Sequence, residues 1–238
     1  METLKSDVIC IIPARGGSKG LPGKNTKLIR NEPLIARPVR HALESGAIGT
    51  VIVTTDDEKI AKLARDAGAI VPFVRPKNLS LDLTTTEETL KHALITYEEM
   101  VNKEFKLAVF LTATDIFRNP QWIKEAILKL DQNPKTESVF SGHMTHKNYW
   151  EQQEDGSWSR VKYWMKEYSS RQIRRAIVRE DTGLTCVSRA HLWRQGKRIG
   201  DCVEIIVNND DFTSIDIHHE EDLLLAEAAI KIRSNFDQ

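Results

Sequence analysis

The sequence has 238 residues, of which 40% are hydrophobic and 29% are charged, and it holds 34 basic and 34 acidic residues without counting histidine. This composition is typical of a globular chain with a sizeable core and argues against disorder. The balanced charge argues against a nucleic-acid binder that works through bulk attraction, although a local basic pocket is compatible with it. No run is apolar for the length of a membrane span. From the balanced charge and from this absence, we expect neither a nucleic-acid nor a membrane partner.

The first seven residues are polar and contain no apolar signal region. Cys10, Cys186 and Cys202 are widely spaced and lack the pair spacing of a zinc site. We therefore expect reduced thiols, a cytoplasmic location and a single domain over residues 1–238.

Short β-branched apolar runs alternate with helical apolar spacing over the first 130 residues. The runs predict strands at 8–12, 50–54, 70–73 and 107–111. Helices are predicted at 33–45, from a cap at Asp56 to Gly68, at 86–101 and at 120–130. This alternation predicts an α/β fold with a Rossmann-like, doubly wound, mostly parallel sheet. Such sheets bind ligands at the carboxyl ends of their strands, so the chemistry is expected just after each of the four strands.

The alternation breaks in the middle of the chain. Candidate strands at 149–153 and 158–163 flank a Glu-Asp-Gly-Ser turn, and three of the five tryptophans lie in this stretch. Aromatic residues on a small β appendage are more typical of a subunit contact than of a ligand site. We interpret residues 143–175 as a dimerisation arm inserted in the domain and expect a homodimer. A strand at 203–207 and an amphipathic helix at 220–232 complete the α/β pattern.

A glycine-rich, basic segment follows the first strand directly. It reads PARGGSKGLPGKN from Pro13 to Asn25, with four glycines that let the backbone turn sharply near a ligand. Free backbone N–H groups in such a loop form a concavity that binds anions. Arg15, Lys19 and Lys24 add three positive charges, which suits a triphosphate. The segment is neither a Walker A loop nor a dinucleotide fingerprint, and the alternative is a surface turn with solvated lysines.

The segment IIPARGGSKGLPGKN resembles the signature loop of the acylneuraminate cytidylyltransferases, or CMP-sialic acid synthetases. VIVTTDDEKIAKLARDAGAIVPFVRPKNLSLDLTTT resembles the second block of that family, and SIDIHHEEDLLLAE resembles its terminal block. The resemblance implies a Rossmann-like nucleotidyltransferase fold that is usually dimeric. It also implies transfer of CMP from CTP to the anomeric hydroxyl of a sialic-acid-like (nonulosonic or ulosonic) acid, with release of pyrophosphate.

The resemblance further implies roles for individual residues. Arg75 would contact the nucleotide near the base or phosphate, and a plain surface arginine is the alternative. Thr85 and Thr86 would lie near the cytosine, with a helix cap as the alternative. Asp216 would bind Mg²⁺, which prefers oxygen ligands, and its alternative is a strand-end or cap residue. The CTP phosphates and ribose would be held, and the charge on them stabilised, by Ala14, Arg15, Gly16, Gly17, Ser18, Lys19, Lys24 and Asn25.

Two departures from the family pattern concern the metal site and the segment after the fourth strand. His218 stands where the terminal block usually has a second aspartate, and histidine is a poorer ligand for Mg²⁺. After the fourth strand the chain reads LTATDIFR where the family usually has LQPTSPLR. Thr112 thus replaces a glutamine that commonly faces the sugar, and Asp115 replaces a serine. Our hypothesis is that Asp115 supplies the missing carboxylate to the metal or the sugar, whereas the alternative is a cap for the helix after Pro120.

The basic segment 171–175, together with Arg179, is a candidate for binding the carboxylate of an acid sugar, with Arg175 as the chosen contact. A solvated charged face is the alternative. Two other functions remain open, namely a nucleotidyltransferase for a sugar-1-phosphate and a nucleotide-binding homologue without turnover, which His218 favours. The acceptor stays open among N-acetylneuraminate, legionaminic, pseudaminic and octulosonic acids.

Overall fold

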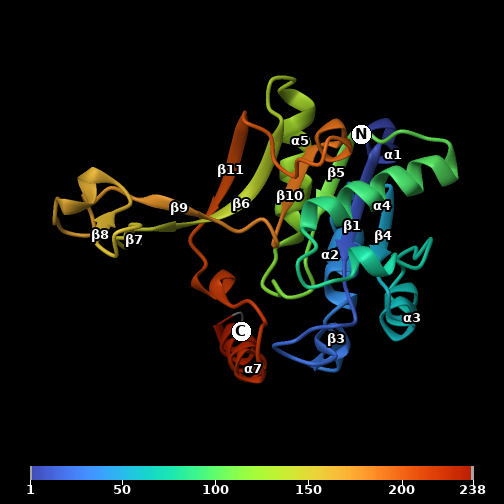
Figure 1. Cartoon of the computed structure of the whole chain (residues 1–238), viewed down its shortest axis with the longest axis horizontal. Coiled ribbons are helices and arrows are strands. Elements are labelled where there is room, and N and C mark those ends of the chain that lie inside the picture. Colours follow the sequence, from blue (N-terminus) through green and yellow to red (C-terminus); the bar gives the residue numbers. More distant parts are fainter. Residues whose placement is uncertain (1, 237–238) are drawn as a thin grey trace.

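A twisted sheet forms the centre of the computed structural model, which describes residues 2–236 (Figure 1). Within these residues the sheet has seven strands in the order β11-β6-β10-β5-β1-β4, and β9 pairs with β6. β1, β4 and β5 are parallel, as are β6 and β11, whereas β9 and β10 run antiparallel to their neighbours. The prediction of a Rossmann-like, mostly parallel sheet is confirmed. The strands are β1 (Val8–Pro13), β4 (Thr50–Thr54), β5 (Leu107–Phe110), β6 (Ser138–Thr145), β9 (Ile177–Glu180), β10 (Cys186–Arg189) and β11 (Val203–Asn208).

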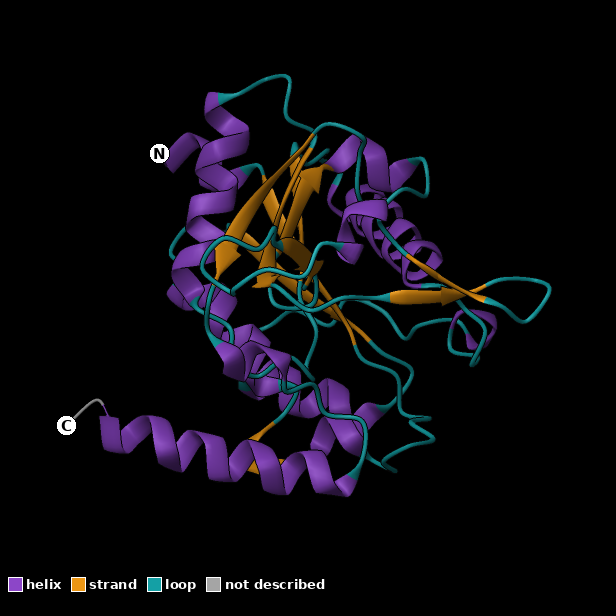
Figure 2. Ribbon diagram, turned by 90° about the vertical axis from the view of Figure 1, so that its left-hand side faces the viewer, coloured by secondary structure: helices purple, strands orange, loops and turns teal. Residues whose placement is uncertain are grey.

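Helices cover both faces of the sheet (Figure 2). One face packs against α2 (Ala36–Glu44), α3 (Glu58–Asp66) and α5 (Pro120–Gln132), whereas α7 (Glu220–Phe236) lies away from the sheet faces and packs near Leu28–Ile29. The other packs against α4 (Thr86–Val101) and α6 (Ala190–Arg194), and the short α1 (Glu2–Ser6) precedes β1. Among residues 2–236, no helix has the length and apolar character needed to cross a membrane.

The residues of β1 alternate between these two layers. Val8, Cys10 and Ile12 pack with the first helix group, while Ile9 and Ile11 pack with α4 and α6. All five are fully buried, and burial of such a side chain stabilises a fold by roughly 1.5–3 kcal/mol. The strand is therefore held firmly at the centre, and the glycine-rich segment begins from a fixed point.

Several local expectations need correction. The helix expected from residue 33 begins at Ala36, because β3 (Glu32–Pro33) pairs with β2 (Leu28–Ile29) in a tight hairpin. The strand expected at 70–73 is not a regular strand, and isolated bridges at Ile70 and Val74 stand in its place. Pro72 explains this outcome, since proline has no N–H to donate to a ladder.

Two helix predictions also change in detail. Asp57, not Asp56, caps α3, and its carboxylate accepts a hydrogen bond from the Ile60 N–H. α7 is less clearly amphipathic than expected, because Leu224 and Leu225 are exposed while Leu223 packs on the core.

Residues 146–176 form an arm that projects from the ends of β6 and β9 (Figure 1). As predicted, the arm contains an antiparallel hairpin, β7 (Trp150–Gln152) and β8 (Trp158–Arg160). The Arg160 guanidinium stacks over the Trp150 ring at 4.2 Å from its centroid. Trp158 and Tyr163 are 61% and 75% exposed, so the arm offers aromatic surface. Its role in dimerisation stays a prediction.

Candidate active site

A cavity of about 510 Å³ opens at the carboxyl ends of β1 and β5. The glycine-rich segment forms one wall, through the predicted residues Ala14, Arg15, Ser18, Lys19, Lys24 and Asn25. Arg75, Thr85, Thr86 and Thr112 line other parts of the same cavity. The structure thus brings most of the predicted nucleotide residues together around one space.

Contacts with neighbouring segments fix the shape of the glycine-rich loop. The Gly16 N–H donates to Asp56 Oδ1 at 2.9 Å, and a Cβ on Gly16 would lie 2.9 Å from Asp57 Oδ2. The Asn25 amide is buried and donates to the Arg15 carbonyl at 3.0 Å. Asn25 therefore shapes the loop as well as lining the cavity.

Two cations of the loop already have an anionic partner. Arg15 Nη1 and Lys19 Nζ lie 3.1 and 2.5 Å from the two carboxylate oxygens of Asp82. The hydrogen bond from Lys19, together with the charges of both cations, lowers the pKa of Asp82. No motif in the sequence had singled out Asp82.

Lys24 connects the loop to the terminal block. Its Nζ donates to the Ile217 carbonyl at 2.9 Å. Burial lowers the pKa of Lys24, while the nearby charge of Asp216 opposes this effect. Gly20 allows the close approach, because a Cβ there would lie 2.7 Å from the His218 carbonyl oxygen.

Asp115 and Asp216 form an acid pair next to Thr114 and His218, which line this cavity, and both aspartates line a neighbouring cavity. Their backbones make an isolated antiparallel bridge, and the Thr112 hydroxyl donates to Asp115 Oδ2 at 2.5 Å. Burial, and then the charge of Asp216, raise the pKa of Asp115 to about 6. The capping alternative for Asp115 is wrong, since the Asn119 side chain caps α5.

The donor set of the acid pair fits a hard divalent cation. Asp216 Oδ2 lies 2.8 Å from His218 Nε2, but Asp216 Oδ1 is buried without a hydrogen-bond partner. Within residues 2–236, no group of three or more His, Cys, Asp or Glu side chains is arranged to hold a metal. Two carboxylates suffice for Mg²⁺, since it commonly takes one or two carboxylates and completes its shell with substrate phosphates and water.

A buried arginine holds the turn that carries Asp115. Arg118 is 5% exposed and donates to the carbonyls of Thr112 and Gly183 at 2.9 and 2.6 Å, and also to the Leu184 carbonyl. A Cβ on Gly183 would lie 1.9 Å from Asp115 Oδ2, so only glycine fits there. The sequence prediction missed Arg118 and Gly183, although the glycine in Asp-Thr-Gly was a visible signal.

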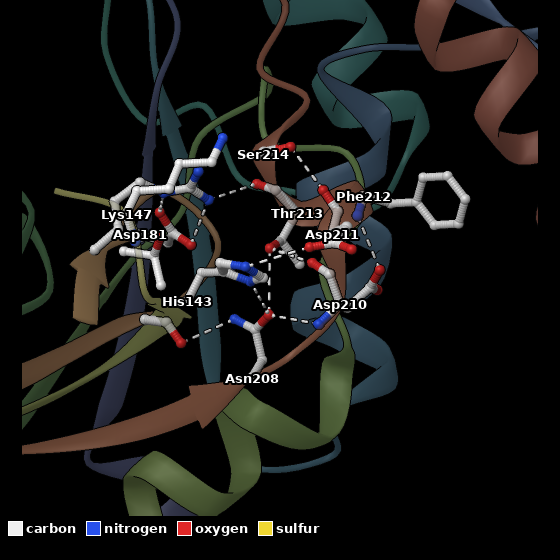
Figure 3. A network of polar contacts seen from close by, with 12 residues as sticks. His143, Lys147, Asp181, Asn208, Asp210, Asp211, Phe212, Thr213 and Ser214 are labelled. Carbon is white, nitrogen blue, oxygen red and sulfur yellow. Dashed lines mark hydrogen bonds and ion pairs between the residues drawn. The ribbon is translucent and has the colours of Figure 1, made fainter. Parts of the chain in front are cut away.

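Two further cavities, of about 340 and 520 Å³, extend from the acid pair to the base of the arm, and Arg179 and Ser214 line both. Arg179 makes a two-pronged ion pair with Asp181 at 2.6 and 2.9 Å. The imidazole of His143 lies between Asn208 and Asp211, with its Nδ1 3.3 Å from Asn208 Oδ1 and its Nε2 3.5 Å from Asp211 Oδ1 (Figure 3). This side of the site is therefore a connected polar network.

The arginine that the sequence analysis chose for the acceptor, Arg175, does not line either of these cavities. Arg175 stacks over the Trp164 ring, 5.8 Å from its centroid. Its neighbours Arg171 and Arg174 line the larger cavity at the base of the arm. One position along an irregular segment changes the direction of a side chain, which the sequence alone could not settle.

Arg75 and Thr85 combine structural contacts with their place at the cavity. Arg75 is 4% exposed and donates to the Thr54 hydroxyl at 3.2 Å and to the Thr54 carbonyl, so the surface alternative is wrong. Burial lowers the pKa of Arg75 to about 10. Thr85 forms a capping box with Glu88 at the start of α4, which bears out its capping alternative. The roles of both residues toward a nucleotide stay predictions.

The doubly wound sheet with a cationic loop after β1 defines a Rossmann-like nucleotidyltransferase fold. Residues 9–227 match the family model described as Cytidylyltransferase, and the chain belongs to this family. The match includes the glycine-rich loop, both members of the acid pair and the first part of α7, up to residue 227.

Similarity to individual proteins of known sequence or structure adds detail to the family assignment. The chain is 38% identical over 120 residues to CMP-N,N'-diacetyllegionaminic acid synthase of Legionella pneumophila, covering 50% of this chain and 51% of the relative. It is 38% identical over 125 residues to pseudaminic acid cytidylyltransferase of Campylobacter jejuni, covering 52% and 53%. The matched stretches thus span about half the length of these curated relatives. A solved CMP:2-keto-3-deoxy-manno-octonic acid synthetase superposes with a TM-score of 0.68 and 14% identity, over 95% of this chain and 99% of that one.

Proposed function

We propose that this protein transfers CMP from CTP to the anomeric hydroxyl of a nonulosonic or ulosonic acid and releases pyrophosphate. The observation that carries the proposal is the junction at Lys24. Its ammonium belongs to the cationic loop and donates to Ile217 O, directly beside Asp216. The cavity that we assign to the nucleotide therefore lies next to the acid pair, and Lys24 connects the two.

The loop side of the cavity suits the triphosphate. The acceptor oxygen forms a bond to the α-phosphorus, and the bond from that phosphorus to the pyrophosphate oxygen breaks. Such transfer depends on positioning and charge stabilisation more than on covalent help from the protein. Arg15, Lys19 and Lys24 would hold the pyrophosphate part and stabilise the charge that develops on it.

The acid pair suits Mg²⁺. The unpartnered Asp216 Oδ1 and the neighbouring Asp115 carboxylate would hold the ion. When bound, Mg²⁺ would neutralise negative charge on the phosphate oxygens. His218 orients Asp216 through its contact with Oδ2 and leaves Oδ1 available.

The cavities between the acid pair and the arm suit the acid sugar. Arg171, Arg174 and Arg179 line the larger of the two, and guanidinium groups bind carboxylates well. Relatives whose names specify legionaminic or pseudaminic acid favour an acceptor of this class. An arginine-rich wall would also suit a sugar-1-phosphate, so that acceptor belongs in the test.

The arm supports a homodimer as part of the proposal. Trp158, Tyr163 and Ile173 are exposed on it, and aromatic surface is enriched in protein interfaces. We expect sedimentation velocity to show a dimer for the intact chain and a monomer for the Trp158→Ser/Tyr163→Ser variant. A monomeric intact chain would contradict this part of the proposal without touching the chemistry.

Pyrophosphate release is the decisive measurement. The chain with Mg²⁺ is assayed with CTP, ATP, GTP or UTP against N-acetylneuraminate, legionaminate, pseudaminate, 3-deoxy-octulosonate and a sugar-1-phosphate. We expect release with CTP and an acid sugar, and its loss in Lys24→Gln but not in the control Lys62→Gln on the exposed face of α3. Release with the sugar-1-phosphate alone, or CTP binding without release, would overturn the proposed reaction.

A further inference from the structure

Asp82 lies in a segment that connects the second block of the sequence to α4. The segment runs from the short turn at Lys77–Leu79 to the cap of α4 at Thr85. Leu83 is 94% exposed, so little packing holds the tip of this segment in place. A segment with few apolar contacts can move at low free energy.

The carboxylate of Asp82, at the tip of this segment, nevertheless contacts the glycine-rich loop. Asp82 Oδ1 lies 3.1 Å from Arg15 Nη1, and Asp82 Oδ2 lies 2.5 Å from Lys19 Nζ. Asp82 also lines the cavity that these cations border. The carboxylate thus occupies the position of an anionic ligand between two groups assigned to the pyrophosphate part of CTP.

We infer that Asp82 competes with the pyrophosphate part of the nucleotide for Arg15 and Lys19. Its carboxylate leaves both cations when CTP binds and pairs with them again as pyrophosphate departs. The inference rests on the proposed function, because it assigns these cations to CTP. The inference goes beyond that function, because it assigns to Asp82 the role of lowering the affinity of the site for the departing pyrophosphate.

Simple electrostatics gives the direction and the scale. Pyrophosphate carries more negative charge than one carboxylate, so it displaces Asp82 when present. The state in which Asp82 pairs with Arg15 and Lys19 lowers the apparent affinity for pyrophosphate, because the state with both cations available is then only partly populated. The side chains of Lys19 and Asp82 are 78% and 43% exposed, which keeps each pair weak. Two such pairs weaken pyrophosphate binding by about fivefold.

Calorimetry on the full chain tests the inference with inorganic pyrophosphate, CTP and CMP as ligands. We expect Asp82→Asn to bind pyrophosphate about fivefold more tightly than the wild type, with a difference that shrinks as salt rises. The control Asp66→Asn removes an equivalent charge from an exposed pair with Lys62 on α3 and should change nothing. CMP, which lacks the departing phosphates, should bind with similar affinity to all variants.

Each other outcome decides between the two proposals. Unchanged or weaker pyrophosphate binding by both Asp82→Asn and Asp82→Ala would overturn the inference while leaving the proposed function intact. Equal tightening for CMP would also overturn it, since the effect would then be general electrostatics. A wild-type chain that binds neither CTP nor pyrophosphate would overturn the proposed function and this inference together.

Discussion

The side of the site proposed for the nucleotide and the side proposed for the acceptor are assembled in different ways. On the nucleotide side, one continuous segment after β1 supplies Arg15, Lys19 and Lys24. On the acceptor side, Asp115 follows β5, Gly183 lies between β9 and β10, and Asp216 follows β11. The first side is formed by one local motif, whereas the second is formed by segments that are far apart in the sequence and come together only in the folded chain.

This difference has a chemical counterpart. Arg15 and Lys19 of the loop are partly exposed, and their ion pairs with Asp82 are of the weak surface kind. Asp115 is desolvated, its carboxylate accepts a hydrogen bond from the Thr112 hydroxyl, and Arg118 holds its turn through the Thr112 carbonyl. We therefore expect substitutions on the acceptor side to have the larger effects.

The largest effect is expected for Asp216→Asn. The amide lacks the charge of the carboxylate, and the unpartnered oxygen that suits Mg²⁺ is lost. Pyrophosphate release should fall by more than about 100-fold at saturating CTP. The exposed Asp131→Asn on α5 serves as the control and should retain full activity. An Asp216→Asn variant with near wild-type turnover would show that the acid pair is not part of the chemistry.

Asp115 should make the stability of the protein depend on pH. Burial raises its folded pKa from 3.8 to about 6, so the folded state binds this proton more tightly than the unfolded state. The resulting stabilisation is present below the unfolded pKa and is lost as pH rises through about 6. In denaturant titrations with chelator, the wild type should lose up to about 3 kcal/mol relative to Asp115→Asn between about pH 4 and pH 7. Parallel pH curves for the two proteins would contradict the burial of the Asp115 carboxyl group.

Local sequence patterns were sufficient for the central strands and the loop. β1, β4 and β5 are continuous apolar runs, and the basic glycines follow β1 without interruption. Adjacent residues with similar chemistry were harder to separate. Asp56 and Asp57 differ by one position, yet one accepts from the loop and the other caps α3.

The acceptor side was only partly predictable for the same physical reason. Asp115 and Asp216 could be proposed as partners from the sequence. Asp216 matches the terminal block of the family, and Asp115 departs from the family pattern after the fourth strand. Their support by Arg118 and Gly183 depends on packing between β5 and the turn before β10, which leaves no periodic pattern. Asp82 lies in an exposed segment, where charge alone is too common to mark a contact.

Gly183→Ala tests whether the acceptor side is as tightly fitted as its contacts indicate. The added Cβ would lie 1.9 Å from Asp115 Oδ2, so the carboxylate or the turn must shift. We expect a loss of about 2 kcal/mol in the free energy of unfolding, and lower turnover with little change in CTP affinity. The double variant Asp115→Ala/Gly183→Ala should regain part of the stability, because the nearest atom is gone. Equal stability of wild type and Gly183→Ala would mean that the turn is free to adjust.

The smallest effect is expected on the nucleotide side, for Thr85→Ala. Its hydroxyl accepts a hydrogen bond from the Glu88 N–H at 3.2 Å and completes the capping box of α4. Loss of the cap should lower the free energy of unfolding by about 1 kcal/mol without ligand, whereas Thr86→Ala, one position into the helix, should change it by less than about 0.5 kcal/mol. Calorimetric titration with CTP then separates the two roles of Thr85. A stability loss with unchanged CTP affinity would make Thr85 a purely structural residue, and a joint loss would show that the cap also positions the nucleotide side of the site.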